Sequence, residues 1–276
     1  MWLFPLVLAT SVASSVASNE NSVAPILRDG AKPTIELGDG TINGERLQPY
    51  ENAWRVTLRK KDGSTREAGI WTETLATREL NGRKVFWWTS SDVVYTGDDL
   101  SKMSVFSNLN IVDARTLAPI RSWHHYSNTD IQHISVEGTH VEMSHSTSDS
   151  GPKETVRFVT PKPVYDLEGG FWAVVVPALK LDIGRSGVIP GVGDKDMPVK
   201  GYPFRVVRQE KLNAGVYGVA DTKVVEVYEP RTRELFTFWV IDKPPYVLRF
   251  TVPGDDYDQS FDELGTVGPS DWGFAR

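Results

Sequence analysis

The sequence contains no cysteine among its 276 residues. This absence excludes disulfide bonds, zinc sites built on thiolates, thiol nucleophiles and a lipid anchor attached to cysteine. Stability must therefore come from the core. With 40% hydrophobic and 24% charged residues, the composition is typical of a folded protein and too apolar for a disordered one. A chain of this length can bury roughly three quarters of its unfolded surface, so a sizeable core is available.

Clustered positive charge is also lacking. The chain has 30 Lys and Arg against 36 Asp and Glu, a net charge of −6, and no long basic run. Affinity for nucleic acid comes largely from grouped Lys and Arg side chains. The charge pattern therefore argues against a nucleic-acid partner.

The apolar run over residues 2–9 is too short to cross a bilayer as a helix. Small residues follow it as far as Ala17 and Ser18, and the polar stretch NENS comes next. This order is typical of a secretory signal peptide, although no Lys or Arg precedes the apolar run. We expect residues 1–18 to be removed on export and the protein to be periplasmic or secreted, peripheral to the membrane at most.

Alternating side chains predict strands through most of the chain. Trp54, Val56 and Leu58 alternate with polar residues before a turn, as in a half-buried strand. The pair Asn81-Gly82 predicts a tight hairpin, because both residues tolerate positive φ. The fold class expected is mainly β, a large curved antiparallel sheet forming a half-barrel or open barrel, with one or two short helices on its concave side.

One segment is predicted to be helical, with Asp166 as its cap and Pro177 closing it after Val176. The glycine-rich segment 183–196 is predicted to be a long connection. The expected organisation is a signal peptide over residues 1–18, a flexible segment over 19–48, one half-barrel domain over 49–254 and an acidic tail over 255–276.

All five histidines lie within residues 121–145, on strands that predicted turns at 127–130, 137–138 and 147–152 would align. Because side chains alternate between the faces of a sheet, this register predicts one polar and one apolar face. The polar face would carry His124, His133, Glu142 and Arg157, with Ser122, Ser135 and His140 beside them. The apolar face would carry Trp123, Ile134, Val141 and Phe158, with Met143 and Val156 beside them.

The polar face has two interpretations. Imidazole and carboxylate groups can bind a divalent metal, but no metal-binding spacing is present and the charge of Arg157 would lie beside the ion. We therefore favour a solvated outer face on which Glu142 pairs with Arg157. No motif of the chain amounts to a catalytic signature, and none implies a cofactor.

Several segments resemble a poorly characterised family of exported bacterial β-proteins of unknown function. They are FWAVVVPALKLDIGRSGVIPG, YPFRVVRQEKLNAGVYGVADTKVVEVYEP, ELFTFWVIDKPPYVLRFTVPG and, upstream, NLNIVDARTLAPIRSWHHYS. The similarity covers most of the chain from about Phe86 to Gly254, although residues 219–221 stand where a Trp is more usual. It implies a half-barrel like those of lipoprotein-localisation carriers, and no catalytic residues.

Three functions fit these observations. The first is an exported binding or carrier protein whose concave face holds an apolar, lipid-like ligand. The second is an extracellular hydrolase or lyase that uses His124, His133 and His140. The third is an envelope structural or interaction protein. For the first, the predicted ligand-binding residues are Trp123, Ile134, Val141, Met143, Val156, Phe158 and Trp172.

Overall fold

The computed structural model describes residues 33–96, 102–127, 131–146, 151–230, 232–254 and 257–265. These residues form one 14-stranded antiparallel sheet, in the order β8-β7-β6-β5-β4-β3-β2-β1-β14-β13-β12-β11-β10-β9. The strands are β1 (Tyr50–Lys60), β2 (Thr65–Leu80), β3 (Arg83–Thr96), β4 (Lys102–Asp113), β5 (Pro119–Ser127), β6 (Ile131–Glu137), β7 (His140–Ser146), β8 (Glu154–Val159), β9 (Ser186–Val192), β10 (Val199–Asn213), β11 (Val219–Glu229), β12 (Glu234–Val240), β13 (Val247–Val252) and β14 (Tyr257–Gly265).

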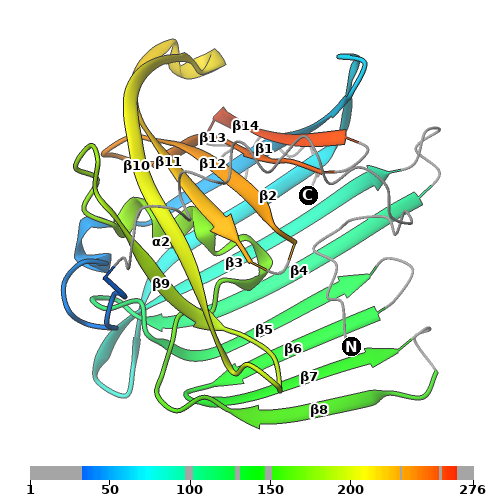
Figure 1. The fold of residues 1–276 in the computed structure, drawn as a ribbon, viewed down its shortest axis with the longest axis vertical. Coiled ribbons are helices and arrows are strands. Elements are labelled where there is room, and N and C mark those ends of the chain that lie inside the picture. Colours follow the sequence, from blue (N-terminus) through cyan, green and yellow to red (C-terminus); the bar gives the residue numbers. More distant parts are fainter. Residues whose placement is uncertain are drawn as a thin grey trace, which may run out of the picture.

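The sheet curls into an open barrel. In Figure 1 strands β9–β12 cross in front of β2–β5, with the helix α2 (Trp172–Ala178) between these two parts of the sheet. Strands β8 and β9 follow each other in sequence but lie at opposite ends of the sheet. The segment that joins them carries both η2 (Glu168–Gly170) and α2, so this connection fills the concave side. The predicted curved antiparallel sheet around a short helix is confirmed.

The hairpin and the strand that were predicted from local sequence patterns are present in the structure. Asn81 and Gly82 have φ angles of 51° and 75°, as a tight turn with two left-handed residues requires. The strand predicted around Trp54, Val56 and Leu58 is β1, and all three side chains are buried. The main core lies on the concave side, where large side chains from distant strands meet α2. No described helix is both long enough and apolar enough to span a membrane.

The predicted helix over 166–176 is shorter and interrupted. Gly169, at the centre of the 3-10 helix η2, has a φ of 65° and breaks the helical path before α2 begins. Asp166 is not the N-cap residue that was predicted: Leu167 precedes η2 and Phe171 precedes α2, and neither makes a side-chain capping bond. The Asp166 Oδ1 atom instead accepts a hydrogen bond from the Glu168 amide at 3.2 Å. Pro177 lies inside α2, which ends one residue later.

Three predicted boundaries need correction. Residues 33–48, expected to be flexible, form bridges with the main fold at Thr34 and Ile42 and contain the 3-10 helix η1 (Gly44–Arg46). Residues 257–265, assigned to an acidic tail, form β14 between β1 and β13. The segment 183–196, expected to be a connection, contains the edge strand β9. The predicted signal peptide lies outside the described residues.

The predicted register was wrong by one residue at the β5–β6 turn. His124 lies opposite Ile134 and Trp123 opposite Ser135, whereas the prediction paired His124 with His133. Since side chains alternate, this shift exchanges the two faces of β5. His124 is therefore fully buried on the concave side, and Trp123 is 42% exposed on the convex side. The predicted pair of Glu142 and Arg157 is confirmed, at 2.6 Å between Oε2 and Nε.

This geometry predicts opposite mutational effects from those that hydrophobicity alone suggests. Trp123→Ala removes an indole ring from the convex surface and should change the free energy of unfolding by no more than about 0.5 kcal/mol. Ile134→Val removes only one methylene, but from a buried site, and should cost roughly 1 kcal/mol. Urea unfolding of both variants measures the difference. A loss of several kcal/mol in Trp123→Ala would show that Trp123 is buried.

Candidate functional site

A cavity of about 100 Å³ lies on the concave side of the sheet, beside η2 and the start of α2. Its walls come from two groups of strands that are far apart in the sequence, β2–β5 and β12–β14. Most of the lining is aromatic or aliphatic, with a few polar groups. The lining residues are Trp71, Asp92, Val94, Phe106, Asn108, Tyr126, Gly169, Gly170, Trp172, Ala173, Phe236, Phe238, Phe250, Val252, Pro253, Gln259 and Phe261.

The aromatic wall is held in place by contacts among its own rings. Phe250 stacks on Phe261, with ring centroids 4.1 Å apart, and on Phe238 at 5.6 Å. Trp71 meets Phe250 edge to face at 5.4 Å. Aromatic pairs in these geometries contribute stability beyond what the burial of their apolar surface alone provides. Contacts among its own rings therefore stabilise the apolar wall of the cavity.

Two glycines bring the backbone of the helical segment against the sheet. Gly169 and Gly170 both have positive φ angles, which residues with a side chain adopt at a cost. A Cβ on Gly169 would lie 2.2 Å from the Asn108 Oδ1 atom, and one on Gly170 would lie 2.9 Å from the Trp71 ring. Larger residues at these positions would push the segment away from the sheet and change the cavity.

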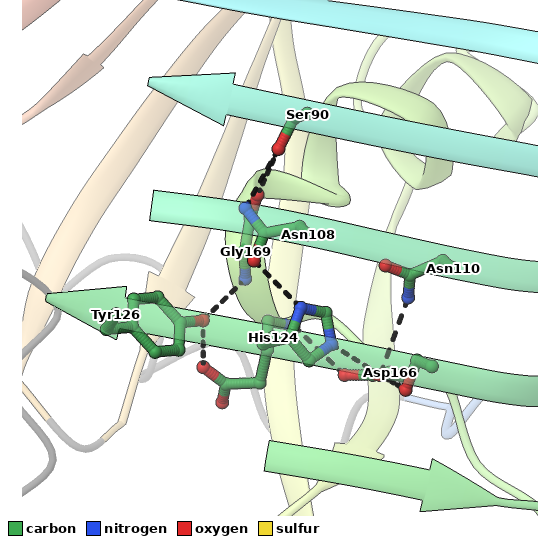
Figure 2. A network of polar contacts seen from close by, with 9 residues as sticks. Ser90, Asn108, Asn110, His124, Tyr126, Asp166 and Gly169 are labelled. Carbon is green, nitrogen blue, oxygen red and sulfur yellow. Dashed lines mark hydrogen bonds and ion pairs between the residues drawn. The ribbon is translucent and has the colours of Figure 1, made fainter. Parts of the chain in front are cut away.

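A buried polar network fixes the same segment to β3, β4 and β5 (Figure 2). His124 is its centre, with Nε2 at 2.8 Å from the Asp166 Oδ2 atom and Nδ1 at 2.9 Å from the Asn108 Oδ1 atom. Ser122 donates a hydrogen bond to the same Asp166 oxygen. The Gly169 amide donates to the Tyr126 hydroxyl at 2.9 Å. These bonds tie the inner segment to the concave face beside the cavity.

The Asn108 side chain orients one of the two groups that contact His124. The Asn108 amide nitrogen donates to the Ser90 hydroxyl at 2.8 Å, so the amide oxygen of Asn108 faces His124. The Nδ1 atom of His124 therefore contacts this amide oxygen, and its Nε2 atom contacts the Asp166 carboxylate. Burial by itself raises the pKa of Asp166, but the charge of His124 and hydrogen bonds from His124, Ser122 and the Glu168 amide outweigh it and lower this pKa.

The network is suited to holding structure rather than to acid-base chemistry. The side chains of His124 and Asp166 have no exposed surface, so a substrate cannot reach them without local opening. The Ser122 hydroxyl bonds to Asp166, whereas nucleophile activation needs a serine hydroxyl bonded to a base such as the imidazole. His124 was predicted to share a catalytic or metal-binding face with His133 and His140, and its position on the concave side corrects that prediction.

The histidines of the convex side lie apart from the cavity. His125 and His133 are neighbours, with 3.4 Å between their Nδ1 atoms, and Trp123 stacks on His125. His140 is exposed. Within the described ranges, no group of three His, Asp or Glu side chains is placed to hold a metal ion.

The predicted ligand-binding residues are divided between three places. Trp172 lines the cavity, and Trp123 lies on the convex face. The remaining five lie on the concave side of β6–β8, where Ile134, Val141 and Met143 pack with Val164 and Val192 in a second cluster. Phe158 packs against that cluster, and Val156 is half-buried beside it.

Sequence reasoning missed most of the cavity. Phe106 and Tyr126 belong both to the cavity wall and to the second cluster, so the two regions adjoin. Alternation on β3 and β4 could have placed Asp92 and Phe106 on the concave face. Each lies two residues from a buried residue of its strand, Val94 and Asn108 respectively, and residues two apart share a face. No local signal indicated that β12–β14 close over them.

Comparison with known proteins gives a family. Residues 53–259, about three quarters of the chain, match a family described as a protein of unknown function, DUF3108. The chain belongs to the DUF3108 family. This confirms the expected membership in a family of unknown function with a β half-barrel. None of the curated proteins is significantly similar to this DUF3108 chain.

One solved structure agrees with the fold of the DUF3108 chain. A β-barrel-like protein of the DUF1849 domain of unknown function from Brucella abortus has a TM-score of 0.50 and 9% identity, over 79% of this chain and 97% of that chain. At this identity the likeness shows the fold alone. A DUF1329 family protein from Desulfovibrio piger, also 9% identical, covers 80% of this chain and 86% of that one, but its TM-score is only 0.22.

Proposed function

We propose that this protein binds an apolar ligand in the cavity between α2 and the concave face, and that it acts as an exported carrier or binding protein for a lipid-like molecule. The observation that supports this most is the cavity itself, an aromatic and aliphatic hollow beside α2. Soluble proteins rarely leave such a volume in the core, because close packing is the norm. Export rests on the apolar start of the sequence and is part of the same proposal.

The size of the cavity limits the ligand. A dry cavity of about 150 Å³ in another protein binds a benzene ring, and the cavity of about 100 Å³ is somewhat smaller. It suits a slender alkyl or acyl chain, with the rest of the ligand lying in the opening. Each methylene that moves from water into such a site contributes about 0.8 kcal/mol.

A series of straight-chain alkanols tests this proposal. Affinity measured by isothermal titration calorimetry should increase roughly fourfold for each added methylene. The increase should stop once the chain fills the cavity, because further methylenes stay in water. A negative heat-capacity change should accompany binding, and a chelator should not affect it. Absence of saturable binding for every chain length would overturn the proposal.

Two adjacent valines offer a matched pair of variants. Val94 is buried and lines the cavity, whereas Val93 is 36% exposed on the opposite face of the same strand. Val94→Phe should fill part of the cavity and weaken alkanol binding by at least about tenfold, which corresponds to the loss of roughly two bound methylenes. Val93→Phe should leave binding unchanged. Equal binding by both variants would place the ligand elsewhere.

A further inference from the structure

One partly buried acid of the cavity wall, Asp92, has no role in the network already described. Asp92, on β3, lies directly opposite Trp71 on β2 and Phe106 on β4. In an antiparallel sheet, residues in such register share a face, so the carboxyl group points to the concave side between two aromatic rings. All three residues line the cavity.

The Asp92 carboxyl lacks the partners that buried acids normally have. Its Oδ1 atom is out of contact with solvent and has no hydrogen-bond partner among the described residues. Burial raises the pKa of this carboxyl well above its usual range, and a hydrogen bond from its own backbone amide offsets only part of the effect. A buried carboxyl oxygen without a hydrogen-bond partner is costly. Such a group is retained more readily where a ligand completes its bonding.

The charges around the cavity indicate which ligand group would do so. Among the lining residues that the structure describes there is no Lys, Arg or His, and Asp92 is the single ionisable carboxyl group. The other polar side chains include the neutral amides of Asn108 and Gln259. Aromatic rings line the same space, and the negative faces of such rings attract organic cations.

We propose that the cavity binds an organic ammonium ion with an apolar body, whose ammonium group pairs with Asp92 and whose apolar part lies against the aromatic wall. This inference rests on the proposed apolar-ligand function and specifies its ligand class. The expected ligand is a simple amine. A zwitterionic lipid headgroup fits less well, because its phosphate would lie near the Asp92 carboxylate and repel it.

Four probes of the same chain length test this assignment at pH 8 by calorimetry, namely octylammonium, octanol, octanoate and octylphosphocholine. Octylammonium should bind at least about tenfold more tightly than octanol, from the combined effect of the ion pair and the aromatic rings. Octanoate should bind more weakly than octanol, and octylphosphocholine no better than octanol. Tighter binding of octanoate would mean that a protonated Asp92 donates to an acid, and would overturn the proposal. So would tighter binding of octylphosphocholine than of octanol.

Asp92→Asn removes the charge with almost no change in shape. The variant should lose the tenfold preference for octylammonium but keep its affinity for octanol, which also shows that the cavity remains folded. Glu67→Gln is the matched control, since Glu67 is 60% exposed on β2, and it should keep the preference. If octanol binds but octylammonium has no advantage in the wild type, the ammonium assignment fails and the apolar cavity stands. If no probe binds, both fail.

Discussion

Asp166→Asn is expected to lower the free energy of unfolding by about 3–5 kcal/mol, the usual cost of removing one partner from a buried ion pair. Asn has nearly the shape of Asp, so the loss reports charge and hydrogen bonding rather than a cavity. It leaves the buried His124 without its carboxylate and the Ser122 hydroxyl with a weaker acceptor. Urea unfolding at pH 7 measures this loss of stability. The comparison holds if the m-value, the slope of the unfolding free energy against urea concentration, is the same in the variant and the wild type.

The control for Asp166→Asn is Glu142→Gln, which breaks an ion pair whose carboxylate side chain is 49% exposed. Exposed pairs contribute about 0–1 kcal/mol. The contribution of Asp166 to the stability of the wild type also depends on pH. The pKa of Asp166 is lowered by folding, so its stabilisation is present above the ordinary value of 3.8 and is lost as the pH falls through the folded-state value. A loss in Asp166→Asn as small as in Glu142→Gln would contradict a tethering role for the network.

The second large effect is a change of stability with pH that depends on Glu73. This buried carboxyl of β2 accepts hydrogen bonds from the indole nitrogens of Trp54 and Trp88, at 3.3 and 2.9 Å, and from the Asn52 amide at 3.0 Å. Burial raises its pKa from 4.5 to about 7, although these hydrogen bonds oppose the shift. The folded state therefore holds this proton more tightly than the unfolded state does.

The sign of the effect follows from that difference. The stabilisation from the protonated Glu73 is fully present below pH 4.5 and is lost as the pH rises through about 7. The loss amounts to about 3 kcal/mol. The Gln side chain of Glu73→Gln cannot ionise, so the free energy of unfolding of this variant should not decline as the pH rises through about 7. This expectation holds whether the variant is more or less stable than the wild type at any one pH. Glu79→Gln, an exposed position on the same strand, should keep the decline. An unchanged pH dependence in Glu73→Gln would show that Glu73 does not titrate in this range.

Local patterns predicted most of the strands because each depends on neighbouring residues. The Asn81-Gly82 turn and the alternation in β1 were correct. The β5–β6 register failed because a shift of one residue exchanges the two faces, and hydrophobicity favoured burial of Trp123 over His124. His124 is buried because Asp166, 42 residues later, pairs with it. The sequence alone does not show which polar side chain finds such a distant partner.

The cavity could not be predicted for a similar reason. The rings of Trp71 and Phe250 pack against each other, with 5.4 Å between their centroids, although 178 intervening residues separate them in the sequence. Strand β14 brings the two halves of the sheet together by pairing with both β1 and β13, but its acidic residues suggested a solvated tail. Trp172 was predicted correctly as a concave residue, because its place in a short apolar helix required burial.

Photoaffinity labelling locates the ligand most directly. An octanol derivative with a diazirine at the end of its alkyl chain would be cross-linked to the wild-type protein, and the labelled peptides identified by mass spectrometry. A ligand in the concave cavity should label the segments around Trp172 and Phe250, which both line it, and Val94→Phe should weaken this labelling at the same probe concentration. Labelling confined to the exposed convex side, around Trp123 and Trp87, would contradict a binding site between α2 and the sheet.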